Sequence, residues 1–287
     1  AASDFELVIL ESGYPGHVTE PELAPLPGWR ADLSEFEGTG QVVIAYLNVA
    51  VTDHGRSYWD LEGDWVVPFA ADPDDLDSGV LGQGIIPGWL SANRGLAFGP
   101  ETDPYPADGD TLGDGVYGFV VDFSDQDWVD RVVAEAVFLV EEGYEGVFLD
   151  DVGRYASSWF LDQKVLDDYG LDRIDRATLA DYAQDMMRLV IAVSDAITPL
   201  GGYVAINGGV DIVAHAFLDG TPLAARFYGA VDGFLMESQY AIEIAADQDG
   251  PWSRALSLFG PSGTDLMALE RRDLVDEAAF YQWSSSH

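Results

Sequence analysis

Short apolar runs recur along the chain, and most of them end abruptly at a polar residue. They cover residues 5–10, 42–47, 118–122, 147–149, 203–206, 231–236 and 266–269. An apolar run of this length, bounded by turn residues, is typical of a strand in a buried parallel sheet. The pattern therefore predicts seven strands.

Helical periodicity separates several of these runs. Helices are expected over residues 29–36, 128–142, 176–197 and 273–283. Strands that alternate with helices are typical of a parallel α/β fold. The strand count predicts a (β/α)8 TIM-like barrel whose last strand is missing or atypical. Residues 60–115 show little periodicity, so they are expected to form a long functional loop or to hold short elements that the pattern does not place.

The length of 287 residues is compatible with one barrel or with two smaller domains. No linker and no change of composition divides the chain, so we expect a single domain over residues 1–287. No apolar run approaches the roughly 20 residues of a membrane span. Residues 1–4 carry neither the basic nor the apolar region of a secretion signal. We expect an extracellular protein whose signal peptide is absent from this chain.

Charge narrows the possible partners. The chain has 51 acidic against 13 basic residues, a net charge of −38, and no cysteine. Such a surface repels nucleic acids and anionic membranes, which excludes both as partners. Adaptation to high salt explains the charge, and so does attraction to a cationic amino-sugar polymer. The even spread of acidic residues along the chain favours the first explanation.

Carboxylates and an amide follow three successive apolar runs. Asp150 and Asp151 follow residues 147–149, Asn207 follows the next run, and Glu237 follows the run after that. Because parallel strand ends meet at one mouth of a barrel, we expect these side chains to lie together. Two carboxylates across a cleft suit glycosidic bond cleavage. One protonates the leaving oxygen, and the other attacks the anomeric carbon or activates water.

Other polar and aromatic residues near the expected mouth are candidates for substrate binding. They are Tyr46, Asn48, Arg56, Tyr58, Trp59, Asp122, Asp151, Tyr155 and Asn207. In a chain with 51 acidic residues, any one acid can be an ordinary loop residue. The coincidence of three polar strand ends is what favours a functional site.

No metal and no cofactor is expected. The four histidines lack metal-binding spacing, and the acidic residues 72–77 lack the spacing of an EF-hand. The Walker motif of nucleotide-binding proteins and the GxSxG motif of serine hydrolases are absent. A calcium-dependent surface protein remains an alternative interpretation of the acidic segment.

Three segments, in the same order, resemble glycoside hydrolase family 114, the endo-α-1,4-polygalactosaminidases. The first is AYLNV at residues 45–49, followed by Arg56 and Tyr58-Trp59. The second is EGYEGVFLDDVGRY at residues 142–155, and the third is VDGF at residues 231–234 with Glu237. The resemblance covers about residues 40–240.

This resemblance implies a (β/α)8 barrel in which Asp150 is the nucleophile and Glu237 the general acid/base. The implied substrate is a polysaccharide of galactosamine or N-acetylgalactosamine with α-1,4 linkages. Asp151 stands where the family usually has asparagine, which leaves open whether Asp150 or Asp151 reacts. Asn48-Val49-Ala50 replaces a common Gly-Glu pair. A carbohydrate-binding barrel without catalytic activity is the alternative.

Overall fold

The computed structural model describes residues 7–11, 33–52, 65–70, 81–86, 97–102, 116–121, 123–156, 176–237 and 251–269. Its main feature is a six-stranded parallel sheet with the strand order β1-β2-β8-β9-β10-β11. The strands are β1 (Leu7–Glu11), β2 (Val42–Asn48), β8 (Gly146–Asp150), β9 (Tyr203–Asn207), β10 (Gly233–Glu237) and β11 (Asp265–Leu269).

Neighbours in this sheet follow one another in chain order, without a reversal. A doubly wound sheet reverses its strand order at a switch point, whereas a barrel wall keeps the order of the chain. The described strands therefore form part of a wall of the (β/α) barrel type. The predicted α/β fold class is confirmed.

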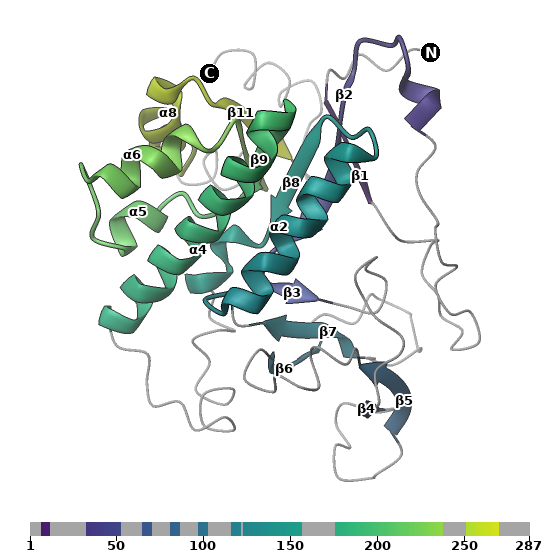
Figure 1. Cartoon of the computed structure of the whole chain (residues 1–287). Coiled ribbons are helices and arrows are strands. Elements are labelled where there is room, and N and C mark those ends of the chain that lie inside the picture. The colour runs from purple at the N-terminus through teal and green to yellow at the C-terminus, as the bar shows by residue number, and fades with distance from the viewer. Residues whose placement is uncertain are drawn as a thin grey trace, which may run out of the picture.

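The two faces of the sheet have separate cores, because side chains alternate along each strand. On one face, residues such as Val43, Leu149 and Ile206 pack with the helices in a large apolar cluster. Figure 1 shows α2 (Gln126–Glu141) and α4 (Arg176–Ile197) side by side on this outer face. The inner face holds a small cluster of Ile44, Phe148, Ala205 and Leu235.

Both long helices begin and end where local chemistry dictates. The Asp125 side chain caps α2 by accepting a hydrogen bond from the Asp127 N–H at 2.8 Å. Gly143, at φ 109°, follows the end of that helix in the left-handed region. Helix α4 keeps the predicted bounds of residues 176–197. It ends in a 3₁₀ turn, η4 (Thr198–Leu200), and Gly201 at φ 84°.

The third predicted strand does not join the parallel sheet, which corrects the expected arrangement. It is β7 (Val116–Val121), which pairs antiparallel with β3 (Val51–Thr52) and β6 (Ala97–Thr102). Strand β2 is bonded directly to β8 instead. The apolar run is real, but hydropathy does not encode the direction in which a strand pairs. Here β3 follows β2 closely and offers β7 an antiparallel edge.

Residues 60–115, which show little periodicity, hold short strands. This was one of the two arrangements expected for the segment. Strands β4 (Trp65–Ala70) and β5 (Leu81–Ile86) pair antiparallel, and β6 lies beyond them in the chain. Figure 1 places these strands at the lower end of the parallel sheet.

Shorter helical elements complete the described chain. They are η1 (Leu33–Phe36), η3 (Val152–Ala156), α5 (Ile212–His215), α6 (Pro222–Gly229), α8 (Pro251–Phe259) and η5 (Gly260–Ser262). Of the predicted helix over residues 29–36, the structure describes η1. The predicted helix over residues 273–283 lies outside the described residues.

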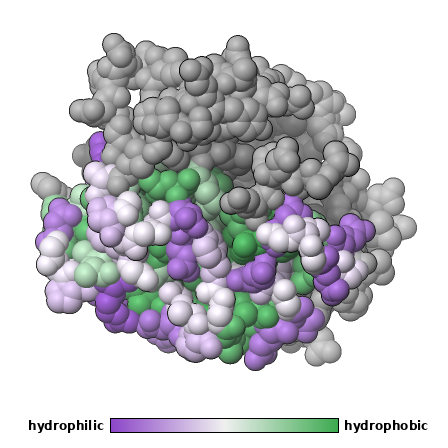
Figure 2. Space-filling view, turned by 90° about the horizontal axis from the view of Figure 1, so that it is seen from above, coloured by the Kyte–Doolittle hydropathy of each residue, from purple (hydrophilic) through white to green (hydrophobic). Residues whose placement is uncertain are grey.

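No helix in the described part of the chain has both the length and the apolar character needed to cross a bilayer. On the face seen from above in Figure 2, hydrophobic residues lie in small areas between hydrophilic ones.

Candidate active site

Polar side chains occupy the inner face where three neighbouring parallel strands end. Asn48 ends β2 and pairs in register with Asp150, which ends β8. Leu149 pairs with Ile206 of β9, so the next position on each strand brings Asp150 beside Asn207. The apolar inner positions Ile44, Phe148 and Ala205 precede these residues. Because side chains alternate along each strand, the polar residues at the strand ends lie on the same face as the apolar inner cluster.

Donors surround the carboxylate of Asp150. The Tyr46 hydroxyl donates to Oδ2 at 2.6 Å. The Asn207 side-chain amide and the Asp151 backbone N–H each donate to Oδ1 at 2.8 Å. An ionised carboxylate only accepts hydrogen bonds, and all three contacts fit that form. They come from three different segments of the chain, so the orientation of the carboxylate is fixed.

A cavity of about 200 Å³ adjoins this carboxylate. It is lined by Asp150, Asp151, Gly153, Arg154, Asn207 and Gly208. The segments after β8 and β9 approach closely here, since a Cβ on Gly153 would lie 3.2 Å from the Gly209 nitrogen. Glycine therefore allows the two segments to close around one side of the cavity.

The second carboxylate, Asp151, is held by a different contact. Its Oδ2 accepts a hydrogen bond from Asn48 Nδ2 at 2.8 Å. Its backbone lies in the left-handed region at φ 64°, which is uncommon for a residue other than glycine. The Arg154 N–H donates to the Asp151 carbonyl at 2.9 Å and begins η3. Asp150 and Asp151 thus differ in partners and in backbone conformation.

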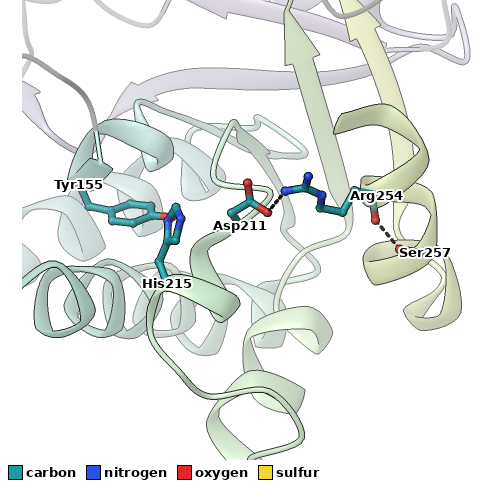
Figure 3. Close-up of polar contacts among 5 residues, drawn as sticks. All are labelled: Tyr155, Asp211, His215, Arg254 and Ser257. Carbon is teal, nitrogen blue, oxygen red and sulfur yellow. Dashed lines mark hydrogen bonds and ion pairs between the residues drawn. The ribbon is translucent and has the colours of Figure 1, made fainter. Parts of the chain in front are cut away.

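Tyr155 lies at the end of this segment and is almost fully buried, with 2% of its surface exposed. Figure 3 shows its hydroxyl directed at His215, and the distance from that oxygen to Nδ1 is 3.0 Å. Burial raises the pKa of Tyr155 far above its ordinary value, and the negative charge of Asp211 adds to the rise. Asp211 itself forms an ion pair with Arg254 of α8.

The structure brings several of the predicted site residues together. Tyr46, Asn48, Asp150, Asp151 and Asn207 form one hydrogen-bonded group. Glu237 ends β10, where its backbone pairs with Leu269. The remaining candidates Arg56, Tyr58, Trp59 and Asp122 lie outside the described residues.

Some residues of the site were not singled out from sequence. Gly153, Arg154 and Gly208 line the cavity, and His215 contacts Tyr155. The Asn-Gly-Gly turn after β9 was a usable signal, because paired glycines often mark a close approach of two backbones. The pairing of Tyr155 with His215 left no sequence signal. In the described residues, no three His, Cys, Asp or Glu side chains are arranged to hold a metal ion.

No protein-family profile and no curated protein matches the chain. Among solved structures, it is similar to the glycoside hydrolase domain of PelA from Pseudomonas aeruginosa. The identity is 17%, the match covers 98% of this chain and 92% of that chain, and the TM-score is 0.45. It is also similar to Aspergillus fumigatus Ega3 in complex with galactosamine, at 12% identity, 97% and 83% coverage and a TM-score of 0.49.

The third similarity is to an α-amylase from H. orenii, at 14% identity and a TM-score of 0.34. That match covers 78% of this chain and 39% of the amylase. A glycoside hydrolase domain is thus among the solved structures that the chain resembles.

Proposed function

We propose that this protein is a glycoside hydrolase in which Asp150 is the nucleophile and Glu237 the general acid/base. The observation that carries the proposal is the Asp150 carboxylate at the end of β8. Three donors hold it, at 2.6, 2.8 and 2.8 Å, and it lines a cavity of about 200 Å³. A nucleophile must be held in a near-attack orientation, and fixed donors provide that.

The position of Glu237 supports the second role. Leu235 belongs to the inner cluster and pairs with Asn207, and position 237 lies two residues further along the same strand. A period of two places position 237 on the inner face. Strands β8 and β10 flank β9, so their backbones are separated by about 9.5 Å, two strand spacings. Positions 150 and 237 thus lie on the same face of the sheet with one strand between them, which supports a shared site.

The proposed reaction has two steps. Glu237 protonates the glycosidic oxygen while an oxygen of Asp150 bonds to the anomeric carbon, and the leaving chain departs as an alcohol. Glu237, now ionised, takes a proton from water. The water oxygen bonds to the anomeric carbon, and the bond to Asp150 breaks. The configuration at that carbon is retained after two inversions.

The proposed substrate is a polymer of galactosamine or N-acetylgalactosamine with α-1,4 linkages. The three sequence motifs around Tyr46, Asp150 and Glu237 support this substrate. A net charge of −38 would also attract a chain of protonated amines at low salt.

The test is the release of oligosaccharides from α-1,4-linked galactosamine polymer, with and without N-acetyl groups, at low and at multimolar salt. Asp150→Asn and Glu237→Gln should each lower the rate at least about 100-fold, the lower end of general acid-base contributions. Asp181→Asn removes an exposed carboxylate from α4 and is the matched control.

Full activity in either site variant would contradict the assignment. Proton NMR of the first-formed reducing end reports the anomeric configuration, and inversion would rule out the nucleophile role. If folded wild-type protein releases nothing but binds the polymer, and both variants bind it equally well, the protein is a carbohydrate-binding barrel instead.

A further inference from the structure

We propose that Asp151 and Asn48 are positioning residues that hold the Asp150 carboxylate, rather than groups that contact the substrate. The changes in turnover that this inference predicts rest on the proposed role of Asp150. It assigns Asp151 a contribution through its backbone N–H, and it assigns Asn48 a contribution through Asp151.

The backbone of Asp151 supplies one of the three donors that the Asp150 carboxylate accepts. At φ 64° the residue is left-handed, and its N–H donates to Asp150 Oδ1 at 2.8 Å. Aspartate and asparagine tolerate this conformation better than other residues with a side chain, and glycine tolerates it best. This turn joins the peptide group between residues 150 and 151 to η3, so we expect a substitution that disfavours the turn to displace the N–H.

Asn48 holds that turn through the Asp151 side chain. Its Oδ1 accepts hydrogen bonds from the backbone N–H groups of Ala50 at 3.0 Å and Val51 at 2.8 Å. This carbonyl contact fixes the plane of the amide, so Nδ2 is directed at Asp151 Oδ2, 2.8 Å away. A second contact of Nδ2, to the Tyr46 hydroxyl, is long at 3.4 Å. The contact with Asp151 is therefore the stronger one.

The turn that carries Asn48 is itself held firmly. The Val49 N–H donates to the Asp150 carbonyl at 3.2 Å, and the Val49 carbonyl accepts from the Trp128 indole at 2.9 Å. The Ala50 carbonyl accepts from the Val121 N–H at 3.0 Å. Asn48 is 7% exposed and has little surface for a substrate. Its environment is that of a fixed support.

Three substitutions at position 151 separate the backbone role from a side-chain role. Asp151→Gly keeps the left-handed turn and the N–H, so kcat should fall no more than about threefold. Asp151→Asn keeps the turn and an acceptor for Asn48, and it should retain most of the turnover. Asp151→Ala disfavours the turn, and kcat should fall about 100-fold with little change in KM, the loss expected from a misplaced reactive group. If Gly and Asn lose as much as Ala, the Asp151 carboxylate acts directly and the inference fails.

Two substitutions at position 48 test the proposed role of Asn48. Asn48→Ala leaves the Ala50 and Val51 N–H groups without their acceptor, so it can also weaken folding. Asn48→Asp retains that acceptor, removes the donor and places a negative charge against Asp151. We expect Asn48→Asp to lower kcat about 100-fold at neutral pH with KM nearly unchanged. A higher KM with unchanged kcat would instead indicate substrate binding by Asn48 and overturn the inference.

Crystal structures decide the positioning claim without turnover. In Asp151→Ala and Asn48→Asp, the Asp150 carboxylate should rotate away from its contacts with Asn207 and residue 151, whereas Asp151→Gly should leave it in place. An unmoved carboxylate in Asp151→Ala would overturn the inference whatever the kinetics. If wild type cleaves no polymer but the carboxylate moves as expected, the proposed function fails and the positioning role stands.

Discussion

Tyr155 illustrates at the scale of one residue how burial changes what a side chain can do. Its position after the Asp150 segment made Tyr155 a candidate for substrate binding. The structure buries all but 2% of it, stacks its ring edge-on against His215 and directs its hydroxyl at Nδ1. The sequence predicted that Tyr155 lies near the mouth of the barrel, because the segment after a barrel strand lies there. Its contacts depend on α5, which carries His215 and has only four residues.

The pKa of Tyr155 leads to a prediction for alkaline pH. Burial, with the charge of Asp211, raises this pKa well above the ordinary value of about 10. The unfolded chain therefore loses the proton at lower pH than the folded protein does. The stabilising effect is fully present below about pH 10 and is lost as pH rises through the higher folded-state pKa.

Urea unfolding between pH 8 and 11 measures the effect. The free energy of unfolding of Tyr155→Phe should fall less steeply above pH 10, by up to about 1.4 kcal/mol per pH unit for one proton. At pH 8 the variant should be less stable by about 1 kcal/mol, because the hydrogen bond to His215 is lost. Identical slopes in both proteins would contradict the raised pKa.

At the scale of elements, apolar runs and helical periodicity predicted most of the parallel sheet and both long helices. Strand β8 and helix α4 were predicted well because burial leaves a clear pattern in their sequences. The direction of β7 was not predictable, because pairing depends on partners distant in the chain. The same limit applies to Asn48. Its contact with Asp151 requires the register of β2 against β8, which joins residues about a hundred positions apart.

Gly146 sets the spacing of β8 and β9. A Cβ at this position would lie 2.0 Å from the backbone oxygen of Tyr203, an atom held in the parallel ladder. Gly146→Ala should destabilise the protein by about 3 kcal/mol or more, because the neighbouring backbone cannot yield. Thermal unfolding followed by circular dichroism measures the loss.

Gly229 is the matched control for this substitution. It ends α6, and nothing lies within 4 Å of an added Cβ. Gly229→Ala should be neutral or stabilise by up to about 1 kcal/mol, as alanine does in a helix. Equal effects of the two substitutions would mean that the β8–β9 contact does not set this sheet spacing.

The whole molecule is dominated by negative charge, with 51 acidic residues against 13 basic ones. In the described part of the chain, ion pairs join exposed or half-exposed side chains, among them Arg188 with Asp185, Arg226 with Asp195, and Arg254 with Asp211. Surface pairs of this kind contribute at most about 1 kcal/mol each. They offset little of the mutual repulsion among the remaining carboxylates, which opposes the compact state.

Salt should therefore stabilise the fold. The Debye length falls from about 10 Å at 0.1 M to about 3 Å at 1 M ionic strength, which shields carboxylates from one another. We expect the melting temperature to rise between 0.1 and 1 M sodium chloride, and to rise similarly with potassium chloride. A melting temperature that stays constant or falls with salt would contradict charge repulsion as the main electrostatic effect that opposes folding. A rise with calcium alone would favour specific binding.

Asn48 also connects two sheets. The Val51 N–H that donates to Asn48 Oδ1 belongs to the first residue of β3, and Val51 pairs with Val120 of the antiparallel sheet. One side chain thus spans from the small sheet to the segment that carries Asp150. These contacts predict that a shift of the antiparallel sheet displaces the segment that carries Asp150. Under the proposed function, the antiparallel sheet would couple polymer binding at a distance to the placement of Asp150, so that remote binding energy is expressed as rate rather than as affinity.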